Sequence, residues 1–275
     1  MNSAFNIFTP TVDISQCNLL VKISTQEISY LITDNKNTCV ALAIFHFAGN
    51  TSSDATANNL KEIVATQTIL QKPFKKVDFI YAFTEAILVP HKFISAGSNA
   101  SLLELSFGDT ADAVIKTDFI ASQNIHTVYR VPKQIDAMIA HLFVQANHSH
   151  IYTLLPDMVV ASGNLLYCIF SPSHITVQLF KVGKLQIIQI FQYKTAADVA
   201  YHLLNLCQRF EVPVNDTVLY LNGMIDNLSG LYKELYNYFL HLHLADLPKK
   251  FIYNEEINKF PAHYFSHLFQ LASCV

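Results

Sequence analysis

Three short turn sequences contain the residue types that could bind an anionic ligand. They are residues 24–26 and 171–173 and the dipeptide at 222–223. Hydroxyl groups and turn amides donate hydrogen bonds to phosphate oxygens, and a glycine lets the backbone approach a ligand closely. Pro172 lacks an amide hydrogen, so the second turn has one donor fewer. The candidate ligand-binding residues are therefore Ser24, Thr25, Ser171, Ser173, Asn222 and Gly223.

The twelve histidines are a second set of residues that could bind a ligand, in this case a metal ion. His263 and His267 are four residues apart on a predicted helix, which places them on one face. A zinc site needs three or four ligands, and the sequence shows no further ligands grouped with this pair. The His-x-His pairs at 148–150 and 241–243 are expected in a loop and near a helix end. We therefore predict no metal site.

The second and third turns belong to a segment, residues 164–224, that repeats the pattern of residues 17–83. Each segment has three stretches of alternating apolar residues, then an amphipathic helix, and then a short buried strand. Thr195 and Asp198 form a capping-box pattern at one helix start, and Asp54 is the expected N-cap of the other. Two such copies indicate an internal duplication. The predicted strands are 19–23, 28–32, 40–44 and 77–81 in the first copy, and 165–169, 175–179, 185–190 and 217–221 in the second.

The rest of the chain surrounds these copies. Between them we predict an inserted subdomain at about 85–150, with strands at 85–93, 114–121 and 126–131 and helices at 99–107 and 134–147. After the second copy we predict an amphipathic helix at 228–242, a short strand at 251–253 and a helix at 262–274. The tyrosines of the 228–242 helix either pack in the core or present an aromatic face to a partner. The expected domains are a first lobe at 1–155, which includes the insertion, and a second lobe at 156–275.

This order of elements resembles the actin-like ATPase superfamily, whose two lobes have ribonuclease-H-like βββαβ folds. Length, duplication and insertion are most similar to the small actin-like proteins of bacterial envelope machines, of the pilus-assembly PilM and secretion GspL type. The chain also looks like an uncharacterised Bacteroidetes family described as having an actin-like ATPase fold. The resemblance covers residue 17 to the end. It implies an α/β fold with mixed sheets, and a fold alone does not assign an activity.

In such ATPases the nucleotide lies between the lobes. The first hairpin of each lobe holds the phosphates, typically with an Asp-x-Gly pattern followed by Ser or Thr, and a Gly-rich turn after the closing strand of the second lobe contacts the adenosine. Here the turns at 24–26 and 171–173 lack both Asp and Gly, and residues 221–224 contain one glycine. The six candidate residues would therefore contact a nucleotide only if one binds at all.

We expect ATP hydrolysis to be lost, because phosphoryl transfer depends on residues that position the metal and the phosphates. The favoured function is a non-catalytic binding or scaffold module without a cofactor. The sequence therefore favours a protein that is not an enzyme. The alternative is a divergent nucleotide-binding ATPase or a sugar-kinase-like enzyme that uses the cleft between the lobes. ATP and Mg²⁺ would be cofactors only under this alternative.

Composition limits the remaining function classes. The chain is 51% hydrophobic and 14% charged, which is enough apolar material for a substantial core. A net charge of -3 gives no electrostatic reason to expect nucleic acid as a partner. We expect no membrane span, because the most apolar stretch is interrupted by Pro156, Asp157 and Gly163. Five scattered cysteines and no secretory signal favour a cytoplasmic protein. The expected partner is another protein or a second copy of this chain.

Overall fold

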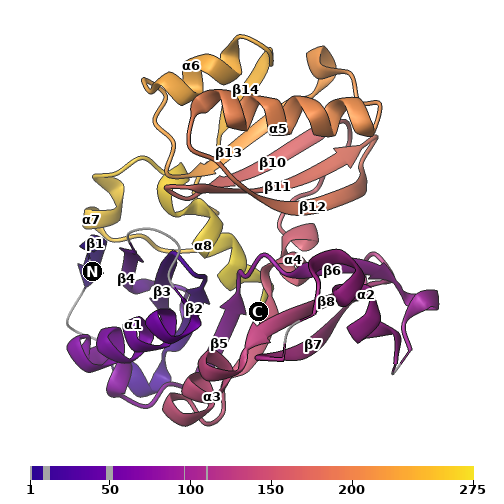
Figure 1. Ribbon diagram of the computed structural model, residues 1–275. Coiled ribbons are helices and arrows are strands. Elements are labelled where there is room, and N and C mark those ends of the chain that lie inside the picture. Colours follow the sequence, from indigo (N-terminus) through magenta and orange to yellow (C-terminus); the bar gives the residue numbers. More distant parts are fainter. Residues whose placement is uncertain (1, 9–12, 48–51, 96, 110) are drawn as a thin grey trace. The chain divides into compact units, whose positions relative to one another are not determined.

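The computed structural model describes residues 2–8, 13–47, 52–95, 97–109 and 111–275 (Figure 1). The chain divides into two compact units. Unit 1 comprises the described parts of Met1–Leu154 together with Lys250–Ile257 and Val275, and unit 2 comprises Leu155–Lys249 and Asn258–Cys274. No helix in the described part of the chain is long and apolar enough to cross a membrane.

Six strands form the main sheet of unit 1: β1 (Asn2–Phe8), β2 (Asn18–Ile23), β3 (Glu27–Thr33), β4 (Cys39–His46), β5 (Lys76–Tyr81) and β9 (Asn147–His150). They lie in the order β1-β4-β3-β2-β5-β9. Strands β1 to β4 pair antiparallel, whereas β5 pairs in parallel with β2 and β9 in parallel with β5. The four strands predicted for the first copy are confirmed, and β1 and β9 extend the sheet at either edge.

Helix α1 (Ser53–Thr66) connects β4 to β5 and buries Leu60 and Ile63. Its N-cap is Ser52, whose side chain accepts a hydrogen bond from the amide of Ala55. The prediction of Asp54 as the cap was therefore wrong. Asp54 lies in the first turn instead, where a carboxylate is favoured by the helix dipole. Helix α1 packs against α3 (Lys133–Leu142).

The insertion forms its own antiparallel sheet within unit 1. Its strands β6 (Ala86–Pro90), β7 (Ala113–Ile120) and β8 (Ile125–Pro132) lie in the order β6-β8-β7. Helix α2 (Ser98–Phe107) packs on this sheet through Leu103, which is buried with Val89 and Val128. The short helix α4 (Ile151–Leu154) follows β9, and α7 (Glu255–Asn258) lies near the end of the chain. In place of the short strand predicted at 251–253, Ile252 forms an isolated parallel bridge with Thr38.

Unit 2 repeats this strand order. Strands β10 (Leu165–Phe170), β11 (His174–Lys181), β12 (Lys184–Gln192), β13 (Val218–Gly223) and β14 (His241–Leu244) form a sheet in the order β12-β11-β10-β13-β14. This order matches β4-β3-β2-β5-β9 of unit 1, including the parallel addition of the last two strands. The predicted duplication is therefore present in the strand topology.

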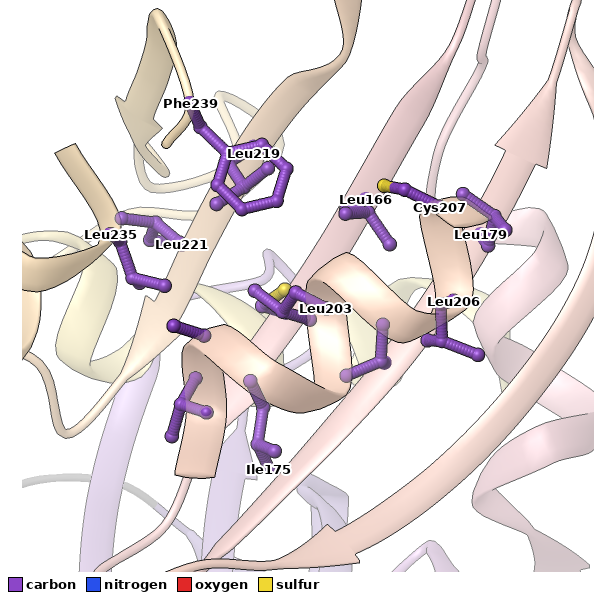
Figure 2. Close-up of a cluster of buried hydrophobic side chains, with 14 of the residues drawn as sticks. Leu166, Ile175, Leu179, Leu203, Leu206, Cys207, Leu219, Leu221, Leu235 and Phe239 are labelled. Carbon is purple, nitrogen blue, oxygen red and sulfur yellow. The ribbon is translucent and has the colours of Figure 1, made fainter. Parts of the chain in front are cut away.

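The two faces of the unit 2 sheet carry different helices. Helices α5 (Ala196–Arg209) and α6 (Gly230–Tyr236) cover one face, and α8 (His263–Cys274) packs against β13 on the other (Figure 1). Figure 2 shows the core beneath α5, where Leu203 and Leu206 of the helix share one buried cluster with Leu166 and Leu219 of the strands. The predicted capping box of Thr195 and Asp198 begins α5.

The predicted helix at 228–242 is only partly correct. Helix α6 ends at Tyr236, and His241–Leu244 forms strand β14 beside β13. Leu242 and Leu244 both pack against the unit 2 core, so a two-residue alternation sets the structure of this segment. The histidines at 241 and 243 therefore lie on an edge strand rather than near a helix end.

The loop predicted for His148 and His150 was also wrong. Both belong to β9, and His150 is fully buried. Its Nε2 lies 3.0 Å from the carbonyl oxygen of Phe83, and its amide donates to Asp118 Oδ2 at 2.8 Å. Burial lowers the pKa of His150 to about 3, although the contact with Phe83 opposes this shift. His150 is thus a neutral structural residue of the sheet.

Candidate functional site

The turn between β2 and β3 contains the first pair of candidate residues. The Ser24 hydroxyl accepts hydrogen bonds from the amides of Gln26 at 3.3 Å and Glu27 at 3.0 Å, and donates to the Glu27 carbonyl oxygen at 3.2 Å. The Ser24 amide donates to the same carbonyl oxygen at 2.9 Å. Three amides and the Ser24 hydroxyl are therefore directed into the turn. Thr25 lies at the tip of the turn, between Ser24 and Gln26.

A buried ionic cluster lies beside this turn, and it was not predicted from the sequence. Lys22 Nζ lies 2.7 Å from Glu27 Oε1, and both side chains are 5% exposed. His46 Nε2 lies 3.5 Å from Glu27 Oε2, and the Ser29 hydroxyl donates to Oε1 at 3.2 Å. Burial alone would raise the pKa of Glu27, but Lys22 and His46 together hold it well below its usual range. The carboxylate is ionised and lies against the side chains of Lys22, Ser29 and His46.

The two-residue alternation of a β-strand could have indicated this cluster from the sequence. Lys22 pairs in register with Ser29, and Ser29 shares a strand face with Glu27, two residues before it. The sequence therefore placed a cation and a carboxylate near one another across the hairpin. The burial of both could not be predicted in the same way, because it follows from the burial of β3 along its whole length.

The turn between β10 and β11 is held by Tyr193. The Tyr193 hydroxyl donates to the Ser171 carbonyl oxygen at 2.7 Å, and the Tyr193 amide donates to the Ser173 carbonyl oxygen at 3.0 Å. The Ser171 amide donates to the His174 carbonyl oxygen at 2.9 Å, which closes the turn. The Ser173 hydroxyl lies 3.3 Å from His174 Nδ1. This turn is also stabilised by contacts within unit 2.

The Asn222-Gly223 pair ends strand β13 beside Phe170, which is in register with Gly223. Gly223 has a φ of 78°, and a Cβ built there would overlap the Phe170 carbonyl oxygen. Asn222 is fully buried; its Nδ2 lies 3.4 Å from the Cys168 carbonyl oxygen, and its Oδ1 has no hydrogen-bond partner among the described residues. The glycine is therefore required by strand packing, whereas Asn222 retains one unused acceptor.

The structure brings the candidate residues together in two groups. Ser171, Ser173, Asn222 and Gly223 lie at the carboxyl ends of the neighbouring parallel strands β10 and β13 in unit 2. Ser24 and Thr25 follow the corresponding strand, β2, in unit 1. Each group occupies the equivalent position in its own copy of the fold.

The histidine pair on α8 has structural contacts. His263 Nε2 lies 2.7 Å from the Ile225 carbonyl oxygen, and burial lowers the pKa of His263. His267 is also buried. Across the residues that the structure describes, no group of three or more His, Cys, Asp or Glu side chains has the arrangement to hold a metal ion.

Comparison with known proteins gives the family. The model of a family described as "Protein of unknown function (DUF3822)" matches residues 8–242. The chain belongs to this family. No curated protein matches it significantly.

Solved structures show the fold of this DUF3822 member. A Bacteroides thetaiotaomicron protein with an actin-like ATPase fold and unknown function has a TM-score of 0.77 at 17% identity, over 94% of this chain and 96% of that one. The PilM-PilN type IV pilus biogenesis complex gives a TM-score of 0.63 at 12% identity, over 93% and 97%. The ethanolamine utilization protein EutJ from Carboxydothermus hydrogenoformans gives 0.53 at 9% identity, over 98% and 93%. The predicted actin-like ATPase fold is confirmed, as is the predicted resemblance to the Bacteroides protein and to PilM.

Proposed function

We propose that this protein is a non-catalytic actin-like module that binds another protein, or a second copy of itself, rather than hydrolysing ATP. The observation that carries the proposal is the internal hydrogen bonding of the β2–β3 turn. The amides of Ser24, Gln26 and Glu27 all donate within the turn. A phosphate-binding turn instead directs its amides outward to the anion.

One carboxylate and one glycine near the turns support the same proposal. Mg²⁺ in a nucleotide site is held by a carboxylate together with phosphate oxygens. Glu27, which follows the first turn, is ion-paired to Lys22 and buried. Gly223 accommodates the Phe170 carbonyl oxygen, so its conformation has a structural cause that needs no ligand.

A structural neighbour and the cysteines support the expected partner class and compartment. The PilM neighbour was solved in a complex with PilN, a second protein. The four buried cysteines and the partly buried Cys274 are all free thiols. Reduced thiols are the norm in the cytoplasm, and this supports the proposal of a cytoplasmic protein.

One observation favours the alternative, a divergent nucleotide-binding enzyme. The Asn222 amide oxygen is buried without a described partner, and it lies at the carboxyl end of a parallel strand. Ligands in open α/β sheets bind at such strand ends. A nucleotide that donates a hydrogen bond to this oxygen would satisfy it.

Phosphate release from ATP in the presence of Mg²⁺ tests the proposal. The wild-type protein should release no more phosphate than the double variant Ser24→Ala/Ser173→Ala, because neither hydroxyl is expected to contact a nucleotide. Release that depends on the protein and disappears in the double variant would establish the enzyme alternative.

A further inference from the structure

Unit 2 contains a cavity of about 520 Å³ that lies away from the candidate turns. It is lined by residues 158–165, by Asp216 and by residues of β10, β13 and β14, together with Gln270 of α8. All lining residues belong to unit 2. Cavities of roughly 300–1,000 Å³ are the size that binds small molecules.

A row of side chains crosses the cavity on the sheet face that carries α8. Tyr167, Tyr220 and His243 are in register on the adjacent strands β10, β13 and β14. The rings of Tyr220 and His243 stack, with centroids 5.5 Å apart and planes 27° apart. Tyr220 is 40% exposed, and in the described part of the chain its ring contacts no ring other than that of His243. A flat ligand can therefore extend the stack.

The charged side chain that lines the cavity indicates the charge of the ligand. Asp216 is the one formally charged side chain among the described residues that line it, and no lysine or arginine faces it. Its carboxylate forms neither a hydrogen bond nor an ion pair with any described residue. Gln270 Oε1 accepts a hydrogen bond from the Tyr167 hydroxyl, which leaves its amide group as a further donor. An anionic ligand is disfavoured by this lining, whereas a cation gains a charged partner.

We infer that this cavity binds a small planar cation, an aromatic amine or amidine, which stacks on Tyr220 and pairs with Asp216. The inference is independent of the proposed loss of ATPase activity, because the cavity uses none of the turn residues. Stacking on an aromatic ring is favourable for both flat rings and cations. The carboxylate then adds a charge-assisted hydrogen bond, which is stronger than a neutral one.

Benzamidine and benzamide test the two parts of this recognition separately. They share a planar ring, but benzamidine is cationic and benzamide is neutral. Titration followed by protein NMR should show saturable benzamidine binding with about tenfold higher affinity than benzamide, as expected for one charge-assisted hydrogen bond. Resonances of the β13 and β14 residues that line the cavity should shift.

Two variants and a control complete the design. Asp216→Asn should remove the preference for benzamidine, and Tyr220→Ala should weaken both ligands by about fivefold. Tyr201→Ala removes another exposed tyrosine, on α5 and outside the cavity lining, and should change neither affinity. The inference is overturned if millimolar benzamidine does not bind saturably, or if the preference survives in Asp216→Asn. Because Asp216 is exposed, that variant tests the charge even if Tyr220→Ala is unstable.

Discussion

The Lys22–Glu27 pair determines whether the carboxylate beside the first turn is available to a metal ion. Both side chains are 5% exposed and lie 2.7 Å apart. Taking two charges out of water costs several kcal/mol, and their mutual attraction offsets this cost only while both are present. The Glu27 carboxylate therefore stabilises the hairpin instead of remaining available for a metal ion.

Replacement of Glu27 by glutamine should destabilise the protein strongly. The change leaves the Lys22 ammonium buried without a counter-ion, which typically costs about 3–5 kcal/mol. Urea unfolding should show a lower midpoint with an unchanged slope. The double variant Lys22→Met/Glu27→Leu should recover most of the loss, because it removes both charges. If Glu27→Gln is as stable as wild type, the pair is not the buried ion pair described above.

The hydrogen bonds of Ser24 mark the limit of residue-level prediction. Its type and position in a turn were readable from the sequence, and they correctly identified a hydroxyl at the end of β2. Serine is both a donor and an acceptor, so its type alone does not reveal that the hydroxyl accepts from two amides of its own turn. The direction of these bonds depends on backbone geometry.

At the scale of elements, the regular parts of the chain were predictable. The alternating segments and the Thr195 capping box gave both copies of the βββαβ unit, because apolar spacing reports directly on which face is buried. Two edge strands, β9 and β14, were not predictable in the same way. Strand β9 reads Asn-His-Ser-His, with no apolar alternation, and its buried His150 is satisfied by contacts from distant segments. Strand β14 has only four residues beside a stronger helical pattern.

Gly223 lies where β13 packs against the end of β10, and its replacement by alanine should disrupt this contact. A Cβ would overlap the Phe170 carbonyl oxygen, at a φ of 78° that disfavours side chains. We expect a loss of at least about 2 kcal/mol, since backbone strain and steric overlap add. Chemical denaturation measures it directly.

Gly230 provides the matched control for this prediction. It begins α6, has no positive φ, and has nothing within 4 Å of the position that an added Cβ would take. Gly230→Ala should leave stability unchanged or raise it by up to about 1 kcal/mol. Equal effects of the two substitutions would contradict the close packing of β13 against β10.

At the scale of the whole molecule, the duplicated topology and the comparison with solved structures agree on an actin-like ATPase fold. The fold supplies equivalent strand ends in both units, where the candidate turns lie. Fold similarity alone does not transfer an activity, so the function rests on the chemistry of those turns. Their internal hydrogen bonds are the basis for proposing a binding module.

Thermal unfolding with and without millimolar ATP or ADP and Mg²⁺ tests this central claim most directly. A ligand at about one hundred times its dissociation constant stabilises the native state by roughly 2.7 kcal/mol. For a chain of this size, each kcal/mol raises the unfolding midpoint by about 2–4 °C. We predict no shift with either nucleotide. A Mg²⁺-dependent rise of several degrees, lost in Ser24→Ala/Ser173→Ala, would contradict the proposal and establish a nucleotide site at the turns.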